Sequence, residues 1–410
     1  MVDLRGSSKK ILRPPEIRGA NRAAVLSLLQ HNDYLSRADV ARQSGLSEGA
    51  ISRIVTDLLN EGLVREDGAE NSTGGRPGRR LALDQRRMVF GAEIQNWETR
   101  CAISTLRGRI VHTHRFRTPA SVTETMDCIA ESFRGFSKDL GRDRLPGIGI
   151  CARGIVNSEL GILVHGSRAG WHNVAVRSYL ETRLKEPVKL ENNVRAAALA
   201  EYTYGLTDVV SRRCFLFVKV DEGVGMGILF DGHLYAGPHM AAGEFGQMVI
   251  ESVPGKERHD RPGCLEKLIS NPVLCQRYAE ASGNKRQASS GDTSARVRRI
   301  AELAAAHDPI ASNIIAGVSR SLGIGISNMV WALDADAIVV DAAITEAWRE
   351  VEPILRQQLP NERELPDKHH RLIRPSVFGG DAALIGAATL PLAMVFAGIN
   401  GSPANPRSSR

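Results

Sequence analysis

The sequence has 410 residues, and at about 100–200 residues per domain this length indicates two to four domains. Hydrophobic residues make up 42% and charged residues 24%, which is typical of a soluble globular protein. The chain contains no apolar run of about eighteen residues, the length of a membrane span, and it starts without the apolar stretch of a secretory signal. Six scattered cysteines without a Cys-x-x-Cys pair argue against a disulfide framework. We therefore expect a cytoplasmic, multidomain protein with no membrane span.

The net charge suits a polyanionic partner without requiring one. It is +7, from 53 basic and 46 acidic residues. The first 87 residues hold 15 lysines and arginines and 11 acidic residues, so +4 of the +7 lies in about a fifth of the chain. The local pattern of this segment decides what that asymmetry means.

The N-terminal segment has the pattern of a helix-turn-helix. Residues 1–20 are predicted to be a mobile basic arm, and a one-sided apolar stripe begins after Asn21. Ser36 stands three residues before Asp39, as at a helix N-terminus, and Gly45 fits the position just past a helix end. Ser47 then offers a second N-cap before another apolar stripe. A helix, a short helix, a tight turn and a third helix make this motif.

A β-wing is predicted after the third helix. Residues 62–68 read as a strand that enters an Asp-Gly turn, and residues 81–83 read as the returning strand. The segment between them is polar and rich in glycine. We place the domain boundary near Asp84, so that residues 21–84 form a winged helix-turn-helix.

The rest of the chain alternates strands with crossover helices, which favours an α/β class. The predicted strands are 89–94, 99–103, 110–117, 147–151, 188–190, 214–220, 225–230 and 337–340. The predicted helices are 122–139, 193–204, 308–333 (broken by Gly323 and Gly325) and 381–397. Strand meanders near residues 89 and 214 suggest two similar lobes. We expect one body over residues 85–397 and a disordered tail over 398–410.

The second helix of the motif and the wing are the candidate DNA-binding elements. In a helix-turn-helix that helix presents its first residues to the major groove, here Ser47, Glu48, Gly49, Ser52 and Arg53. An arginine can bond guanine through two hydrogen bonds. The wing adds Arg76, Arg79 and Arg80, and arginines of this kind enter a narrow minor groove. Two alternatives stay open: a helical hairpin for protein contact, and a solvated basic linker.

With these elements in place, the chain resembles the ROK family, which contains sugar-responsive repressors and sugar kinases. The resemblance rests on a winged helix, a Gly-Gly-Arg-Pro linker and motifs in the body. These motifs are GIGICARGIV (147–156), GILVHGSRAGWHNVAVR (161–177), ENNVRAAALAE (191–201), DEGVGMGILFDGHLYAGPHMAAGEFGQ (221–247), GCLE (263–266) and GGDAALIGAA (379–388). It implies two ribonuclease-H-like lobes, of the actin and hexokinase kind, with a ligand cleft between them.

The same resemblance implies which residues line a sugar pocket. They are Gly154, Ser167, Asn192, Asn193, Glu244, Gln247 and Glu266. Carboxylates and amides suit sugar hydroxyls because each group can pair with more than one of them. For Glu244 and Glu266 the alternative is an ion-paired contact between the lobes.

The kinase chemistry of the family is not matched residue by residue. The family's kinases carry an Asp as base, and this chain has Asn193, whose amide cannot accept the sugar proton. Residues 91–98 lack the paired glycines and the Thr of the family's phosphate loop. Residues 341–343 replace a Gly-Gly pair near the nucleotide base. We therefore expect no phosphoryl transfer.

The family's structural zinc is not expected either. The motif that ends in His in the family ends here in Gln247, and one cysteine of three, Cys264, remains. His259 and Cys264 are weak candidate ligands, with Glu257 as a third, but a single cysteine beside a helix is more often a buried small residue. We expect no cofactor.

The leading hypothesis is a regulator, most simply a repressor. It would bind double-stranded operator DNA and a small sugar or sugar derivative, and it would act as a homodimer or as a tetramer. One rival is a sugar kinase with an appended DNA-binding domain. The other is a regulator that responds to a protein partner after the loss of sugar binding.

Overall fold

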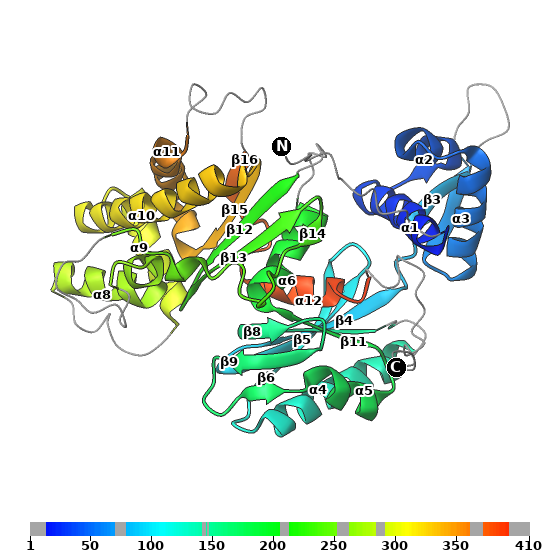
Figure 1. Ribbon diagram of the computed structural model, residues 1–410, viewed down its shortest axis with the longest axis horizontal. Helices are drawn as coiled ribbons and strands as arrows, with labels where there is room; N and C mark the ends of the chain where they lie inside the picture. Colours follow the sequence, from blue (N-terminus) through cyan, green and yellow to red (C-terminus); the bar gives the residue numbers. More distant parts are fainter. Residues whose placement is uncertain are drawn as a thin grey trace, which may run out of the picture.

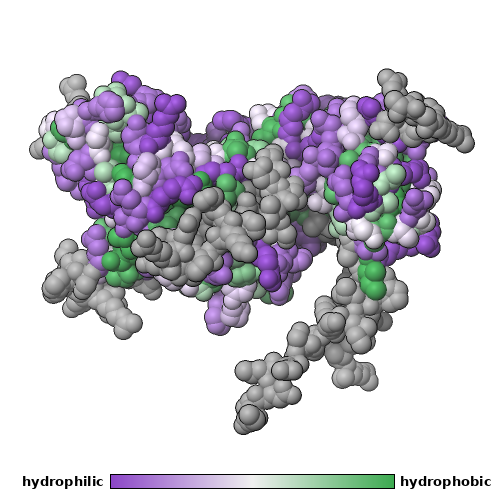
Figure 2. Space-filling model, turned by 90° about the horizontal axis from the view of Figure 1, so that it is seen from above, coloured by the Kyte–Doolittle hydropathy of each residue, from purple (hydrophilic) through white to green (hydrophobic). Residues whose placement is uncertain are grey.

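The computed structural model describes residues 14–69, 79–141, 145, 147–205, 213–251, 262–283, 292–360 and 372–392. Figure 1 shows a small N-terminal domain beside a body of two lobes, with two helices between the lobes. The predicted tip of the wing, the loop before Cys264 and the C-terminal tail lie outside the described residues. The face seen in Figure 2 is mainly hydrophilic, and its apolar side chains gather in smaller patches.

The N-terminal domain is a winged helix-turn-helix, as predicted. Its helices are α1 (Pro14–His31), α2 (Arg37–Ser44) and α3 (Glu48–Asn60). Its strands are β1 (Leu35–Ser36), β2 (Val64–Ala69) and β3 (Arg79–Leu83), paired in the order β1-β3-β2. Helix α1 begins at Pro14, earlier than the predicted start at Asn21. Proline fits the first turn of a helix, where its missing N–H has no role.

The helix ends of this domain follow the capping residues in the sequence. Ser36 and Asp39 form a reciprocal capping box at the start of α2, and Gly45 ends that helix with a left-handed φ of 69°. Ser47 caps α3 by accepting a hydrogen bond from the Ala50 N–H. These caps fix the turn that positions α3 against the other two helices.

Lobe 1 is built on a five-stranded sheet in the order β11-β7-β4-β5-β6. Its strands are β4 (Met88–Ile94), β5 (Glu98–Thr105), β6 (Ile110–Arg117), β7 (Ile148–Ala152) and β11 (Val188–Asn192). Helices α4 (Val122–Leu140) and α5 (Val176–Leu184) share one core cluster with this sheet. A small sheet of β8 (Gly154–Asn157), β9 (Ile162–Gly166) and β10 (His172–Val174) completes the lobe.

Lobe 2 repeats this arrangement with the order β14-β13-β12-β15-β16. Its strands are β12 (Cys214–Val220), β13 (Val224–Phe230), β14 (His233–Leu234), β15 (Ala337–Ala342) and β16 (Leu372–Pro375). The helices of this lobe are α7 (Leu265–Ile269), α8 (Asn271–Ser282), α9 (Thr293–Ala305), α10 (Pro309–Leu333) and α11 (Trp348–Gln358). In both lobes an antiparallel meander is extended by two parallel strands. The predicted pair of ribonuclease-H-like lobes is confirmed.

Two helices lie between the lobes, α6 (Asn193–Ala200) and α12 (Ala382–Thr389) (Figure 1). They touch backbone to backbone, because a Cβ on Gly386 would lie 1.8 Å from the carbonyl oxygen of Ala196. Helix α6 continues as a π-turn, η2 (Glu201–Gly205), and a 3-10 turn, η7 (Gly379–Asp381), precedes α12.

Two predictions about the C-terminal helices need correction. Helix α10 is continuous, and Gly323 and Gly325 do not break it. They allow close packing, because a Cβ on Gly325 would lie 2.6 Å from Leu265 and one on Gly323 would lie 2.8 Å from Gln358. Helix α12 ends at Thr389 rather than continuing to residue 397 as predicted. Pro391 follows closely, and the described chain ends at residue 392.

By length and composition, one described helix is apolar enough to cross a membrane, and it is α10. Its apolar residues include Ile315, Val318, Leu322 and Ile326, which are buried in the core of lobe 2. A core helix of a globular lobe accounts for that composition. All six cysteines are free thiols, and five of them are buried.

Candidate functional site

Helix α3 presents the predicted DNA-contacting residues on its solvent face. Ser47, Glu48, Gly49, Ser52 and Arg53 are all exposed, whereas Ile51, Ile54, Val55 and Leu58 of the same helix are buried. The Arg53 guanidinium donates to the Gly49 carbonyl oxygen at 3.2 Å, so the side chain lies along the exposed face. The five predicted residues therefore lie on an exposed face, opposite the buried face of α3.

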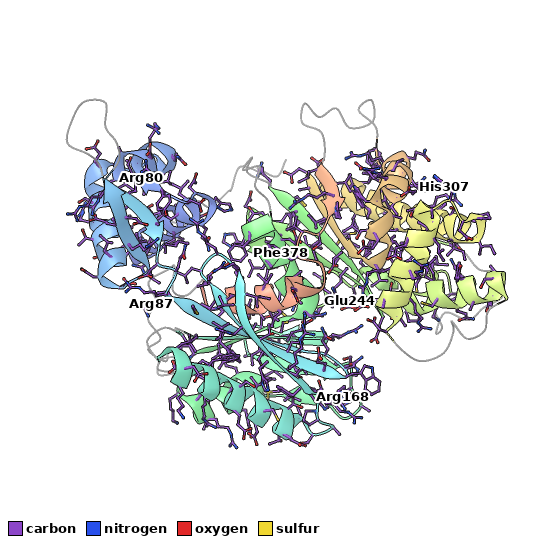
Figure 3. All side chains as sticks on the ribbon, turned by 180° about the vertical axis from the view of Figure 1, so that it is seen from behind. Arg80, Arg87, Arg168, Glu244, His307 and Phe378 are labelled. Atoms are coloured by element: carbon purple, nitrogen blue, oxygen red, sulfur yellow. The ribbon has the colours of Figure 1, made fainter. Side chains whose placement is uncertain are left out.

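The base of the wing carries further basic residues beside α3. Arg79 and Arg80 are exposed at the start of β3, and Figure 3 shows Arg80 in the winged domain. Arg76 lies outside the described residues. Glu66 of β2 accepts from Arg79 at 2.6 Å and from Arg37 at 3.0 Å, and these arginines hold the pKa of its carboxyl below the usual value. Arg37 also donates to the Ser52 hydroxyl at 3.3 Å, so it connects the wing to α3. The sequence analysis did not predict a role for Arg37.

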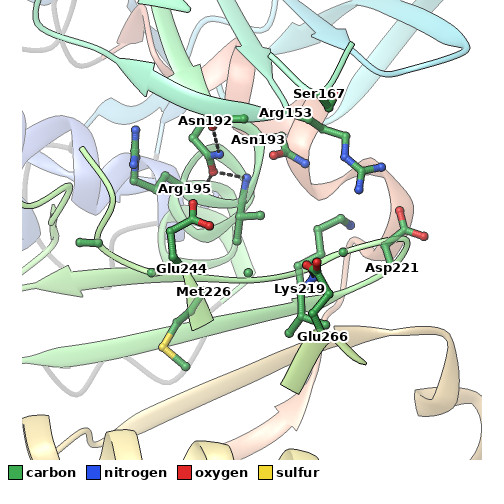
Figure 4. Close-up of a pocket in the computed structure, with 17 residues that line it drawn as sticks. Arg153, Ser167, Asn192, Asn193, Arg195, Lys219, Asp221, Met226, Glu244 and Glu266 are labelled. Carbon is green, nitrogen blue, oxygen red and sulfur yellow. Dashed lines mark hydrogen bonds between the residues drawn. The ribbon is translucent and has the colours of Figure 1, made fainter. Parts of the chain in front are cut away.

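A pocket of about 220 Å³ opens between the two lobes of the body (Figure 4). It is smaller than the roughly 300–1,000 Å³ of sites for drug-sized ligands, which favours a small molecule. The pocket brings together six of the seven predicted sugar-binding residues: Gly154, Ser167, Asn192, Asn193, Glu244 and Glu266. The seventh, Gln247, is half-buried in the 3-10 turn η3 (Phe245–Gln247) and does not line the pocket.

The two asparagines of the pocket have different surroundings. Asn192 is the N-cap of α6: its Oδ1 accepts from the Val194 and Arg195 N–H groups at 2.8 and 3.1 Å, and its Nδ2 donates to the Gly154 carbonyl oxygen at 2.9 Å. Its amide thus shapes the pocket through contacts to protein. No other described residue hydrogen-bonds the Asn193 amide, which therefore faces the pocket with its bonding capacity unused.

Two carboxylates face the same space from lobe 2, as Figure 4 shows. Glu266, in the first turn of α7, accepts a hydrogen bond from the Val224 N–H at 3.1 Å. The protein around Glu244 displaces part of its water and raises its pKa, and the Glu266 carboxylate raises it further. The alternative of an ion-paired contact between lobes finds no support, because no described cation lies within salt-bridge distance of either group.

The pocket also contains three cations that the sequence reading did not select. Arg195 is bonded to Glu191 at 2.6 Å, Lys219 to Asp341 at 2.6 Å, and Arg153 to Glu222 at 2.9 Å. Burial opposes the charged form of Lys219, but Asp341 outweighs it and raises the pKa of the amine. Arg153 lies inside the motif GIGICARGIV, directly before Gly154. Its position in that motif could have identified it as a pocket residue.

The strand β4 and the turn η7 are joined by contacts through Arg100. Arg100 of β5 donates to Glu93 of β4, to Asp381 at 2.7 Å and to the Gly380 carbonyl oxygen at 2.5 Å. Both Arg100 and Glu93 are buried. A guanidinium and two carboxylates thus fill the region between β4, β5 and η7.

A second set of contacts ties the lobes together at the rim. Ser167 donates to Asn96 at 2.6 Å, and Asn96 in turn donates to Glu222 of lobe 2 at 3.3 Å, where Arg153 also binds. Asn96 belongs to the loop between β4 and β5, and Glu222 to the loop between β12 and β13. The two loops are therefore bonded to each other across the cleft.

The described residues contain no group of three or more metal-ligating side chains close together. Cys264 is 2% exposed, and its backbone pairs with Val249 ahead of α7. His259 and Glu257 lie outside the described residues. Cys264 therefore has the environment of a buried small residue.

Two family models match this chain. The model of the ROK family matches residues 89–393, which is most of the chain, and a model described as winged helix-turn-helix DNA-binding matches residues 20–65. The first covers both lobes together with α6 and α12. The second runs from the middle of α1 to the start of β2.

Individual relatives agree with this division. The DNA-binding transcriptional dual regulator NagC of Escherichia coli is 25% identical over 81% of this chain and 82% of its own length. A xylose repressor of Bacillus spizizenii is 24% identical over 91% of this chain and 95% of its own. The crystal structure of a ROK family transcriptional regulator, a homologue of the E. coli MLC protein, superposes with a TM-score of 0.76 at 23% identity, covering 94% and 98% of the two chains. A ROK glucokinase of Streptomyces griseus, solved with glucose and AMPPNP, matches with a TM-score of 0.60 at 23% identity over 74% of this chain and 98% of its own.

Proposed function

This chain belongs to the ROK family, and from that premise we propose that it is a transcriptional repressor that binds operator DNA through its winged helix. We propose further that the pocket of its body binds a sugar or sugar derivative as effector, without phosphorylating it. The observation that carries this proposal is the joint presence, in one chain, of an exposed recognition helix and a small polar pocket between two lobes.

Sugar binding is supported by the chemistry of the pocket. Asn193, Glu244 and Glu266 offer an amide and two carboxylates that can each pair with hydroxyl groups. Repressors named for N-acetylglucosamine and for xylose are among the relatives of this chain. The class of ligand we propose is a monosaccharide or a close derivative.

The absence of phosphoryl transfer is supported by two features. Asn193 stands where a kinase needs a carboxylate to accept the proton of the sugar hydroxyl. The family resemblance would put the phosphates near residues 91–98, and the Arg100–Glu93–Asp381 cluster there contains two carboxylates that would repel a polyphosphate. We propose that the nucleotide half of the cleft has become a structural contact.

The effector would act by shifting a population. One recognition helix reads only a few base pairs, so two copies related by a two-fold axis would read a palindromic operator, as a dimer or within a tetramer. A sugar that binds one arrangement of the lobes more tightly shifts the population towards that arrangement. It releases DNA only if the spacing of the two winged domains in that arrangement does not fit the operator.

The test is operator binding measured by fluorescence anisotropy. Fragments from the promoter of the protein's own gene and from neighbouring sugar-utilisation promoters would be titrated with and without D-glucose, D-xylose, N-acetyl-D-glucosamine and their phosphates. The variant is Arg53→Ala, and the control is Arg349→Ala, which removes the same charge from an exposed position of α11.

We expect specific binding that a sugar weakens, and a loss of about 1–3 kcal/mol in Arg53→Ala alone. Binding that no sugar alters would reject sugar sensing and leave a regulator that answers to another partner. Equal loss in both variants would reject base reading by α3. ATP turnover in the presence of a sugar would reject the non-enzymatic body.

A further inference from the structure

Helix α6 connects the pocket to the opposite end of the body. Its N-cap Asn192 and its first residues Asn193, Val194 and Arg195 line the pocket. Its alanines, among them Ala196 and Ala200, are fully buried. The helix continues without interruption into the π-turn η2, which ends at Gly205. A displacement of α6 at its pocket end is therefore transmitted to the π-turn.

The π-turn is anchored to lobe 2. Glu201 is 0% exposed, and its Oε1 accepts hydrogen bonds from Ser376 and from the Val377 and Phe378 N–H groups, the latter two at 2.9 and 3.2 Å. Arg374 donates to the carbonyl oxygen of Gly205 at 2.6 Å. The π-turn is therefore bonded to lobe 2, whereas the N-cap of α6, Asn192, is bonded to Gly154 of lobe 1.

Tyr204 brings this turn into contact with lobe 1. A methyl group on Gly108, in the turn between β5 and β6, would lie 2.6 Å from Cδ2 of Tyr204. The backbone of Gly108 has a left-handed φ of 74°, which only glycine adopts readily. The ring thus packs directly on Gly108. We name residues 105–109, which include Gly108, the docking turn.

The other side of the docking turn contacts the winged helix. Leu106 is 1% exposed and belongs to the same core cluster as Leu26 and Leu29 of α1, while the Gln30 side chain donates to its carbonyl oxygen at 3.2 Å. Arg107 donates to the carbonyl oxygens of Leu29 at 3.0 Å and Asn32 at 2.5 Å, and it pairs with Asp33. A cation at the C-terminus of a helix satisfies the last carbonyl groups and the helix dipole.

We propose that the docking turn couples the pocket to the DNA-binding domain, with Arg107 as the positioning residue that transmits its movement to α1. This inference rests on the proposed function, because it names the route by which an effector would change operator binding. The turn is shared by the core of the winged helix and by Tyr204 of the π-turn. A shift of lobe 2 against lobe 1 therefore changes the support of α1 without any contact between ligand and winged helix.

The first experiment needs no ligand and uses the full chain. Hydrogen exchange of the backbone amides in the last turn of α1 would be compared in Arg107→Ala and Arg109→Ala. Both variants remove one arginine from the docking turn, but no described residue bonds the Arg109 side chain. We expect about tenfold faster exchange in Arg107→Ala, since three anchoring contacts are lost, and none in Arg109→Ala. Equal exchange in the two variants would overturn the role of Arg107.

The same readout tests the connection to the pocket. Asn192→Ala removes the N-cap of α6, and Ser121→Ala removes the N-cap of α4, which lies outside the proposed route. We expect faster exchange at the end of α1 in Asn192→Ala only, with partial restoration in Asn192→Asp, because Asp restores the cap of α6 but cannot donate to the Gly154 carbonyl oxygen. Normal exchange at α1 in Asn192→Ala would overturn the coupling, even if Arg107 still anchors α1.

The second experiment separates this inference from the proposed function. Operator affinity would be measured for wild type, Arg107→Ala and Arg109→Ala, with and without the sugar among glucose, xylose and N-acetylglucosamine that raises the melting temperature most. We expect Arg107→Ala to keep the sugar-induced melting shift and lose the sugar effect on DNA. A full sugar effect in Arg107→Ala would overturn the coupling. If the wild type binds DNA with an affinity that no sugar changes, the proposed function is overturned. The hydrogen-exchange results would still test the role of the docking turn.

Discussion

The Arg100 guanidinium donates two hydrogen bonds to a single carboxylate oxygen of Glu93, from Nε at 3.0 Å and from Nη2 at 2.5 Å. The side chains are 9% and 4% exposed, so neither charge is compensated by water. Burial opposes the charged form of Arg100, but Glu93 and then Asp381 outweigh it and raise its pKa. The pair is therefore a fixed part of the fold.

Arg100→Ala is expected to destabilise the protein strongly, because it leaves the Glu93 charge buried without a partner. The cost expected for breaking a buried pair from one side is about 3–5 kcal/mol. Arg299→Ala is the matched control, because it removes an exposed arginine paired with Glu302 and should change stability by less than about 1 kcal/mol. Urea denaturation measures both values, and equal midpoints for the two variants would contradict the prediction.

Glu201 is expected to make stability depend on pH. Burial raises the pKa of its carboxyl, and its Oε2 has no hydrogen-bond partner among the described residues. The folded state therefore holds this proton more tightly than the unfolded state does. The free energy of unfolding should decrease as pH rises from the ordinary value of 4.5 to the raised pKa, and then stay level.

Glu201→Gln is the test of that dependence, since it keeps an acceptor for Ser376 and the two N–H groups but carries no charge. Melting temperatures between pH 5 and pH 8 should fall less in this variant than in wild type. Glu346→Gln, at an exposed position, should retain the wild-type profile. Identical profiles for wild type and Glu201→Gln would show that the carboxyl stays ionised throughout this range.

Glu244 is expected to give sugar binding an acid limit. Its pKa is raised by the surrounding protein and by Glu266, and the ionised carboxylate is the stronger acceptor for hydroxyl groups. Affinity should fall as pH is lowered through this raised pKa, because the protonated form loses acceptor capacity. Calorimetric titration of the effector at several pH values measures the trend. In Glu244→Gln binding should be weaker and flat with pH, and an unchanged pH profile would show that another group titrates.

Two glycines of α10 should respond in opposite directions to the same substitution. Gly325→Ala places a methyl group 2.6 Å from Leu265 and 2.8 Å from Phe245, which should cost about 1–3 kcal/mol. Gly317→Ala meets no atom within 4 Å and should stabilise by about 0.5–1 kcal/mol, because alanine favours the helix. Thermal melting compares the two. Destabilisation by Gly317→Ala would indicate that this face of α10 has a partner.

The sequence predicted the elements whose signals are local. Ser36, Asp39 and Gly45 give the bounds of α2 because capping is satisfied within one turn of the chain. It failed for α10, where Gly323 and Gly325 indicate a break. Their function is set by Gln358 and Leu265, which are distant in the sequence, so no local pattern could show it.

The pocket was predicted only in part, because some of its residues are positioned by contacts between segments that are distant in the sequence. Family motifs selected six of the residues that line it, while Lys219 was missed because its partner Asp341 lies on a strand that is distant in the sequence. Asn192 was selected as a ligand, but its amide is used by α6 and Gly154. Whether a side chain is engaged by protein depends on three-dimensional contacts that a motif does not contain.

The passage from wing to body is very short. Only residues 84–87 separate β3 from β4, and Arg87, at the junction in Figure 3, donates to the carbonyl oxygens of Glu61 and Gly62. A linker this short allows little movement of the winged domain relative to the body. In a two-fold assembly the bodies would then fix the distance between the two α3 helices. The number of base pairs between the two operator half-sites should therefore tolerate almost no variation. Genomic targets could be recognised by that spacing as much as by their bases.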